Sequence, residues 1–237
     1  MSTRIVIGRK PIMDRLNAGD PIEKLFIRDG RDHRLDDHAI ARLARQKKCP
    51  IQRLSADVFD SRFDGNHQGV AIVVHDYNQA TLADIIDHPP SVILVLDHLK
   101  DPHNFGAICR TAEAFGVHHI MYPKNRAAQI TPSVEKTAAG AMEHMVFIKQ
   151  TNLRQALQTL RKNGIWVYGA SSNQGQPIDR ASLNHPMAII CGSEESGISP
   201  GLAPLIDAFI HIPMLGKTSS LNVSVATGII IHSIVSK

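Results

Sequence analysis

Runs of consecutive apolar residues in the last two-thirds of the chain constrain its fold more than any other feature. They are separated by stretches with helical periodicity, and they read SVILVLD, HHIMY, HMVFI, IWVYGAS, MAIICG and AFIHIP. Strands that are apolar on both faces are typical of a parallel sheet covered by helices on its two sides. The pattern therefore predicts an α/β domain with a mostly parallel sheet.

The first part of the chain, about 75 residues, follows a shorter alternation of strands and helices. Its elements are a strand KLFIRD, a helix over residues 35–48, a strand IQRL, a short helix SADVFDSRF and a strand GVAIVV. This order predicts a small α/β sandwich. A short helical piece from Thr81 follows, and two consecutive prolines cannot continue it. We therefore expect a first domain over residues 1–77, a linker over 78–90 and a second domain over 91–237.

Charge is spread unevenly over the two domains. The chain has a formal net charge of +4, and residues 1–80 carry 14 Lys and Arg against 11 Asp and Glu. Four of these cations gather at the end of one predicted helix: Arg42, Arg45, Lys47 and Lys48. Such a cluster can hold the phosphates of a nucleic acid, although cations also stabilise helix C-termini in proteins that bind no nucleic acid.

Several classes of protein do not fit this sequence. The longest apolar runs fall far short of the roughly 20 residues that a membrane helix needs, and the start, MSTRIVIGRK, lacks the apolar stretch of a signal peptide. The three cysteines form no CxxC pair, and the adjacent His118 and His119 of one predicted strand point to opposite sides. We therefore expect a cytoplasmic protein with a sizeable core and with no membrane or metal partner.

Ligands of doubly wound sheets bind beyond the carboxyl ends of the strands. The loops after Asp97, Ser171, Gly192 and Pro213 are therefore the candidate site loops. No GxGxxG fingerprint occurs in the chain, so a nicotinamide or flavin site has no motif behind it.

The first of these loops leads into LDHLKDPHNFGAICRTAEAFG, residues 96–116. Asp101 or Asn104 can cap a helix here, and Gly116 can end it. Asn104 and Arg110 are six residues apart, which separates them by about 120° around a helix axis. We therefore expect Asn104 in the loop or the first turn, with Arg110 a turn or more further along. On this segment alone, a capping residue and a surface cation explain the two equally well.

Another candidate loop lies in IICGSEESGISP, residues 189–200, a glycine-bounded turn directly after a buried strand. Its carboxylates, Glu194 and Glu195, would repel a phosphate, and no Lys follows them as in a P-loop. The loop suits a ligand with hydroxyl groups or a positive charge. A plain strand-to-helix turn capped by Ser199 explains the spacing equally well.

The last candidate loop lies in IPMLGKTSSLNVSVATGIII, residues 212–231. Its part SLNVSVA alternates with a period of two, as a strand does. The small and apolar residues that follow also suit a buried helix capped by Ser219 or Ser220. Periodicity alone leaves both structures open.

Three segments in these loops, DPHNFGAICRTAEAFG, GSEESGIS and IPMLGKTSSLNVSVATG, together resemble the signature motifs of the SpoU family of RNA ribose 2'-O-methyltransferases, in the SPOUT superfamily. The first domain, with GRKPIMDRL and HQGVAIVV, resembles the L30e-like RNA-binding module of the subgroup that acts on guanosine in large-subunit ribosomal RNA. The resemblance implies a homodimer that transfers a methyl group from S-adenosylmethionine to a ribose 2'-hydroxyl, with a guanosine of 23S ribosomal RNA as the expected target. It also implies a C-terminal trefoil knot, which the pattern of strands does not indicate by itself.

The family pattern also assigns site residues by position. Around the reacting ribose it places Asn104, Arg110, Glu194, Ser220 and Asn222. Around the cofactor it places Gly192, Ser193, Ile212, Met214 and Leu221. One departure is Glu195, which stands where the family commonly has Gly, so the resemblance leaves the geometry of this loop open.

The hydroxyl proton is the difficult part of this chemistry. Family accounts make Arg110 the base, but a guanidinium with a pKa above about 12 is almost never deprotonated in a protein. Two versions of the role of Arg110 follow. Either a nearby RNA phosphate helps Arg110 lose its proton, or Arg110 stays charged and stabilises the developing alkoxide.

Three alternatives are open. The target can be transfer RNA or another ribosomal nucleoside, although the minimal transfer-RNA enzymes of the family lack the L30e-like module. The chain can bind RNA without catalysis, which would predict damaged motifs, whereas the residues assigned to the ribose are all present. A dehydrogenase on a similar sheet would need the dinucleotide fingerprint that is missing.

Overall fold

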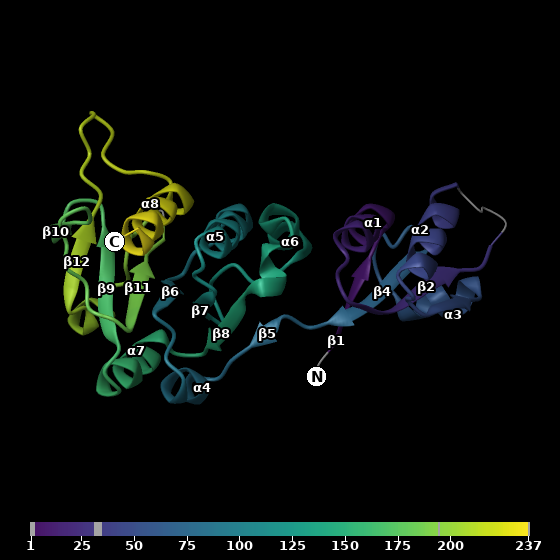
Figure 1. Cartoon of the computed structure of the whole chain (residues 1–237), viewed down its shortest axis with the longest axis horizontal. Coiled ribbons are helices and arrows are strands. Elements are labelled where there is room, and N and C mark those ends of the chain that lie inside the picture. Colours follow the sequence, from purple (N-terminus) through teal and green to yellow (C-terminus); the bar gives the residue numbers. More distant parts are fainter. Residues whose placement is uncertain (1–2, 31–34, 194, 237) are drawn as a thin grey trace. The chain divides into compact units, whose positions relative to one another are not determined.

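The computed structural model describes residues 3–30, 35–193 and 195–236 of the chain. Contacts between residues divide the chain into two compact units, Met1–Asp76 and Tyr77–Lys237. Figure 1 colours the first unit from purple to blue and the second from blue through green to yellow. Each unit has its own sheet and its own core.

The first unit is a sheet with helices on both faces. Its described strands are β1 (Thr3–Ile7), β2 (Ile22–Arg28), β3 (Ile51–Leu54) and β4 (Val70–His75), in the order β1-β4-β2-β3. Strand β4 pairs antiparallel with β1 and β2, whereas β2 and β3 are parallel. The helices are α1 (Arg9–Ala18), α2 (Leu35–Gln46) and α3 (Ala56–Arg62).

Successive residues of β2 face the two sides of this sheet. Leu25 packs with α1 and α2, whereas Phe26 packs with Phe59 of α3. The predicted α/β sandwich is therefore confirmed. Strand β1 and helix α1 were not predicted, and the helix expected over residues 35–48 ends at Gln46. Lys48 adopts a left-handed backbone with a φ of 57°, which cannot continue a right-handed helix.

The second unit confirms the predicted mostly parallel sheet. Its described strands follow the order β10-β12-β9-β11-β6-β7-β8-β5, and each adjacent pair is parallel. The strands are β5 (Asn78–Gln79), β6 (Val92–Leu96), β7 (His119–Pro123), β8 (Val146–Gln150), β9 (Trp166–Ser171), β10 (Gln176–Pro177), β11 (Met187–Cys191) and β12 (Ala208–His211).

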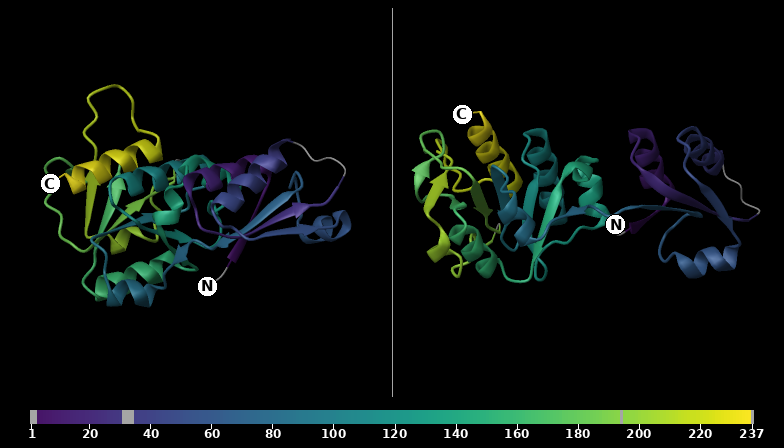
Figure 2. Two further views of the ribbon diagram at one scale, coloured as in Figure 1. Left: turned by 45° about the vertical axis from the view of Figure 1, so that its right-hand side comes forward. Right: turned by 60° about the horizontal axis from the view of Figure 1, so that its bottom comes forward.

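Helices cover both faces of this second sheet, as Figures 1 and 2 show. One face carries α5 (Pro102–Ala114), α6 (Pro132–Ala138) and α8 (Val223–Val235). The other face carries α4 (Leu82–Asp87) and α7 (Leu153–Lys162). Two short 3-10 helices are Ala141–His144 and Ala203–Leu205.

Burial on both faces explains the apolar runs of the sequence. In β6, Leu94 and Leu96 pack on the α5 side, whereas Ile93 and Val95 pack on the α7 side. Every residue of β11 is buried as well. Because both faces are covered, a ligand reaches this sheet at the ends of its strands.

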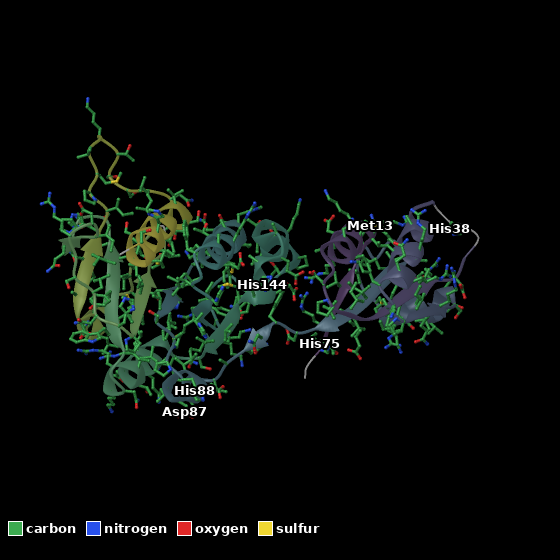
Figure 3. All side chains as sticks on the ribbon, viewed as in Figure 1. Met13, His38, His75, Asp87, His88 and His144 are labelled. Carbon is green, nitrogen blue, oxygen red and sulfur yellow. The ribbon has the colours of Figure 1, made fainter. Side chains whose placement is uncertain are left out.

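The segment 78–90, expected as a linker, contributes two elements to the second unit. Strand β5 pairs with β8, and Thr81 and Asp84 form a capping box at the start of α4. Within it, the Asp84 N–H donates to Thr81 Oγ1 at 3.2 Å and the Thr81 N–H donates to Asp84 Oδ2 at 2.7 Å. Ile85 is buried on the α7 side of the sheet, and Figure 3 labels Asp87, the last residue of α4. These contacts tie the segment to the second sheet.

Helix α5 packs closely against α6 and α8. A Cβ at Gly106 of α5 would lie 2.6 Å from both the Thr137 Cβ and the Val134 carbonyl oxygen of α6. A Cβ at Gly228 of α8 would lie 3.1 Å from the Thr111 Cγ2 of α5. Glycine at these contacts lets the helices approach and fixes the position of α5 on the sheet.

Two further expectations concern the chain as a whole. Among the helices of the described residues, none combines the length and the apolar character that a membrane crossing requires. The trefoil knot implied by the resemblance stays a prediction.

Candidate active site

Loops from separate parts of the sequence meet at the carboxyl edge of the second sheet, because β6, β11 and β12 are parallel. They begin after Leu96, Cys191 and His211, the last residues of these strands. The loop between β12 and α8 projects beyond this edge in Figure 1. The candidate residues lie on these loops and on the helices that follow them, except that Glu194 falls outside the described residues.

Asn104 and Asn222 join two of these loops. Asn104 is the third residue of α5 and is almost fully buried. Asn222 caps α8, where its Oδ1 accepts from the Ser224 N–H at 2.9 Å and from the Ser224 hydroxyl at 2.6 Å. The Asn222 Nδ2 donates to the Asn104 Oδ1 at 3.0 Å, across 118 residues of sequence. Two helix N-termini therefore lie side by side at the sheet edge.

The helix caps decide between alternatives that the sequence left open. Helix α8 begins at Val223 and is capped by Asn222, so neither Ser219 nor Ser220 is the cap and SLNVSVA is not a strand. The cap of α5 is Asp101, whose Oδ1 accepts from the His103 N–H at 2.9 Å. Asn104 therefore lies in the first turn, as its spacing from Arg110 predicted.

Arg110 lies almost two turns along α5 from Asn104, and its side chain is exposed. Within the described residues it makes neither an ion pair nor a hydrogen bond through its guanidinium. The fold therefore leaves Arg110 open to a ligand. Ser220 is exposed as well, and Met214 is half-buried.

The loop after β11 is a tight turn. The Ser193 N–H donates to the Gly197 carbonyl at 3.0 Å, and the Gly197 N–H donates back at 2.9 Å. A Cβ at Gly192 would lie 2.1 Å from the Gly197 carbonyl carbon, so only glycine fits there. The alternative of a helix capped by Ser199 is wrong, because a 3-10 helix at Ala203–Leu205 is the next helical element in the described chain.

Asp97 is a site residue that the sequence did not single out. Its carboxylate is fully buried, and its Oδ2 accepts from the Ser199 N–H at 2.6 Å. Its Oδ1 lies 2.6 Å from His98 Nδ1. A buried carboxylate requires such partners, and here they tie the loop after β6 to the loop after β11. The sequence feature that could have identified Asp97 is its position as an acidic residue directly after a fully apolar strand.

Glu195, the departure from the family pattern, forms an ion pair at the surface. Its Oε2 lies 2.7 Å from the Nζ of Lys100, and both side chains are well exposed. The hydrogen bond from Lys100 lowers the pKa of Glu195 below its ordinary value. This carboxylate therefore engages the loop after β6.

Three backbone positions at this edge have unused hydrogen-bonding groups. Among the described residues, nothing bonds to the backbone N–H or C=O of Gly192, Ile212 or Leu221. Ile212 and Leu221 are half-buried, and Ile212 packs against the core on the α5 side. Backbone groups without a partner in the protein are free to bind a ligand.

Neither metal nor thiol chemistry is indicated at this edge. No cluster of three or more His, Cys, Asp or Glu residues in the described chain could hold a metal ion. Burial raises the pKa of Cys109 to about 12 and that of Cys191 to about 11, so both thiols are neutral at physiological pH. Thr227 of α8 donates to the Cys191 Sγ at 3.3 Å, which makes Cys191 a packing residue between α8 and β11.

Two family models match the chain in its two parts. Residues 91–232 match the SpoU rRNA Methylase family, and residues 5–80 match the model described as RNA 2'-O ribose methyltransferase substrate binding. The chain belongs to the SpoU rRNA methylase family. A TrmH family tRNA/rRNA methyltransferase of Staphylococcus aureus strain MSSA476 is 32% identical over 243 residues, which cover 100% of this SpoU-family chain and 97% of the relative.

Solved structures of the family share the fold of this SpoU protein. An RNA methyltransferase of the TrmH family from Porphyromonas gingivalis superimposes with a TM-score of 0.69 and 26% identity, covering 98% of this chain and 88% of that one. The TrmH/SpoU tRNA modifying enzyme of A. aeolicus is 30% identical, with a TM-score of 0.57 over 65% of this chain and 79% of its own. The AdoMet complex of AviRb from Streptomyces viridochromogenes, at 22% identity, has a TM-score of 0.69 over 99% of this chain and 90% of that one, and is similar in fold alone.

Proposed function

We propose that this SpoU-family chain transfers the methyl group of S-adenosylmethionine to the 2'-hydroxyl of a ribose in RNA, and that the ribose belongs to a guanosine of 23S ribosomal RNA. The hydrogen bond between Asn104 and Asn222 carries the proposal, because it joins the N-termini of α5 and α8 within two segments that resemble family motifs. N–H groups at helix N-termini favour negative charge, and a ribose oxygen becomes negative as it loses its proton.

The chain's own groups fit S-adenosylmethionine. The unpartnered backbone groups of Gly192, Ile212 and Leu221 can bind the adenine and ribose of the cofactor, with Ser193 and Met214 lining the same space. The turn after β11 carries carboxylates and no Lys, which suits a cofactor with a positive sulfonium and no phosphate. When bound, S-adenosylmethionine supplies an activated methyl carbon.

The chain's side chains position the ribose and manage its proton. Asn104 and Asn222 orient the ribose by hydrogen bonding, with Ser220 beside it. Arg110 binds the ribose and the adjacent phosphate, and either stabilises the alkoxide as a cation or loses its proton with help from that phosphate. Glu194 fixes Arg110 or a neighbouring donor.

The substitution Arg110→Lys tests this arrangement. Lysine keeps the charge but loses the planar fork, so we expect methyl transfer to fall by about 10²-fold. Binding of S-adenosylhomocysteine, measured by calorimetry, should stay unchanged. Arg180→Lys, at a cation whose side chain is 83% exposed, is the matched control. A near-normal rate for Arg110→Lys would contradict both versions of the role of Arg110.

The two parts of the chain have separate tasks in this proposal. The domain over residues 1–77 binds the RNA substrate, which the substrate-binding family model over residues 5–80 supports. The domain over residues 91–237 carries out methyl transfer. The cations at the end of α2, among them Arg42 and Arg45, can hold RNA phosphates.

Mapping 2'-O-methyl groups in cells that lack the gene tests the RNA target. We expect one methylated guanosine of 23S ribosomal RNA to lose its modification. Transfer RNA is the second candidate, because the names of two relatives include it. Loss of a methyl group from transfer RNA alone would establish that candidate instead.

Stabilisation of the chain by NAD and not by S-adenosylhomocysteine in a thermal shift assay would overturn the methyltransferase proposal.

A homodimer belongs to the same proposal. Helix α8 exposes three large apolar side chains, Val225, Ile229 and Val235, and Phe115 at the end of α5 is exposed as well. Val225 and Ile229 are four residues apart and therefore lie on one face of α8. The ring of Phe115 contacts that of His232, with centroids 5.5 Å apart. An apolar surface that continues from one helix to the next suits a second copy of the chain.

A further inference from the structure

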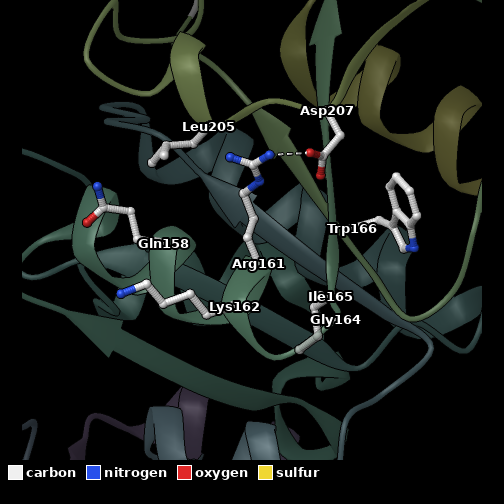
Figure 4. Close-up of a pocket in the computed structure, with 8 residues that line it drawn as sticks. All are labelled: Gln158, Arg161, Lys162, Gly164, Ile165, Trp166, Leu205 and Asp207. Atoms are coloured by element: carbon white, nitrogen blue, oxygen red, sulfur yellow. Dashed lines mark hydrogen bonds and ion pairs between the residues drawn. The ribbon is translucent and has the colours of Figure 1, made fainter.

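The second unit has a pocket at the amino edge of its sheet, opposite the candidate active site. Its volume is about 630 Å³, and it is lined by the end of α7, the start of β9 and the segment before β12, including Gln158, Arg161, Lys162, Trp166 and Asp207. Figure 4 shows Arg161 between Gln158 and Trp166. Since β9 has six residues, the two edges are about 20 Å apart. The function proposed above uses none of these residues.

Helix α7 carries concentrated positive charge, and its last turn lines this pocket. It contains Arg154, Arg161 and Lys162, and it contains no acidic residue. Its buried face consists of Leu153, Ala156, Leu157 and Leu160. All three cations, together with Gln155 and Gln158, are therefore on the exposed face.

The stability of the helix does not account for this pattern. Arg161 and Lys162 in the last turn favour the helix dipole, but Arg154 is the second residue of α7, where a carboxylate is preferred. A typical solvated helix also pairs its cations with carboxylates four residues away, and α7 has none to offer. The pattern fits a helix that faces a polyanion.

The one carboxylate that lines the pocket is already engaged. The Arg161 Nη2 donates to the Asp207 Oδ1 at 2.6 Å, and the Val167 N–H donates to the Asp207 Oδ2 at 2.8 Å. In the described part of the chain, Arg154 and Lys162 have no such partner. Two positive charges therefore stay available to a ligand.

Trp166 adds an aromatic surface to these charges. It is the one tryptophan of the chain, and 42% of it is exposed. Its indole makes no ring contact or hydrogen bond within the described residues. Exposed aromatic rings beside cations are the combination with which proteins bind single-stranded nucleic acid, because bases stack on the ring while phosphates contact the cations.

We propose that the α7 surface, defined by Lys162 and Trp166 at this pocket and by Arg154 near the other end of the helix, binds a single-stranded segment of the RNA substrate. The inference rests on RNA being the substrate. Arg154 and Lys162 contact phosphates, and a base stacks on Trp166. At about 3.4 Å per nucleotide step, roughly six nucleotides span the distance between the two edges of the sheet, so one RNA molecule reaches both.

The fluorescence of Trp166 provides a local readout, since the full-length chain has no other tryptophan. We expect a short single-stranded oligoadenylate to quench it in a saturable way, and salt to weaken the binding. The double variant Arg154→Gln/Lys162→Gln should lower the slope of log affinity against log salt by about 0.7 for each cation removed. Trp166→Ala should weaken binding of a labelled oligoadenylate by about fivefold or more, measured by anisotropy.

Lys136→Gln is the matched control, because Lys136 is an exposed last-turn cation of α6 on the other face of the sheet. It should bind the oligoadenylate with the salt slope of the unmodified chain. Three results would overturn the inference: bound RNA that leaves Trp166 fluorescence unchanged, a double variant with an unaltered salt slope, or equal quenching by AMP at the same nucleotide concentration. The readout needs neither cofactor nor methyl transfer, so it fails or succeeds separately from the methyltransferase proposal.

Discussion

At the scale of single residues, Asp97 holds two loops of the candidate site together. Asp97→Ala leaves the Ser199 N–H without its acceptor inside the protein, a loss of about 1–3 kcal/mol. Because Ser199 follows the turn that we assign to the cofactor, we expect the KM for S-adenosylmethionine to rise about tenfold. Steady-state kinetics with both substrates would measure it, and the KM for RNA should change less.

Two further variants test whether Asp97 acts through its hydrogen bond with Ser199. Asp97→Asn keeps an oxygen for the Ser199 N–H and should retain most of the cofactor affinity. Glu195→Gln removes a second side-chain link between the same loops, but that ion pair is exposed, so it should have little effect. If Glu195→Gln weakens cofactor binding and Asp97→Ala does not, the hydrogen bond between Asp97 and Ser199 does not support the cofactor site.

Residue-level expectations from the sequence succeeded where helix geometry alone decided them. The 120° between Asn104 and Arg110 predicted that Asn104 lies in the loop or the first turn, and it lies in the first turn of α5. The contact of Asn104 with Asn222 was beyond any spacing argument, because only the folded chain brings positions 118 residues apart together. Asp97 was missed for the same reason, since its partner Ser199 comes from another loop.

At the scale of elements, the approach of α5 to α6 depends on Gly106. Alanine is the better helix former, yet its Cβ at this position would meet the backbone and a side chain of α6 at 2.6 Å. We therefore expect Gly106→Ala to lower the free energy of unfolding by about 1–3 kcal/mol, measured by urea denaturation. Gly201→Ala, where a Cβ meets nothing within 4 Å, should stay within about 0.5 kcal/mol. A stabilised Gly106→Ala variant would show that α6 can move away from α5 without loss.

Elements were predictable where burial set the residue pattern and unpredictable where two patterns overlapped. Strands such as β6 and β11 are buried on both faces, so they appeared as apolar runs, whereas the short, mostly exposed β5 and β10 were not predicted. SLNVSVA carried a strand period, but Asn222 caps a helix there, and capping outweighs alternation over so few residues. Segment 78–90 looked like a linker because α4 buries little beyond Ile85.

At the scale of the whole molecule, the apolar surface of α5 and α8 predicts the oligomeric state. A charge placed on that surface would have to be buried in the dimer without a partner, which opposes association. We therefore expect the unmodified chain to sediment as a dimer and Val225→Glu to sediment as a monomer with an unchanged melting temperature. Val58→Glu is the matched control, because Val58 lies in the first unit and is 49% exposed against 51% for Val225. A chain that is monomeric before substitution, or a Val225→Glu variant that stays dimeric, would mean that this apolar surface serves something other than a second copy.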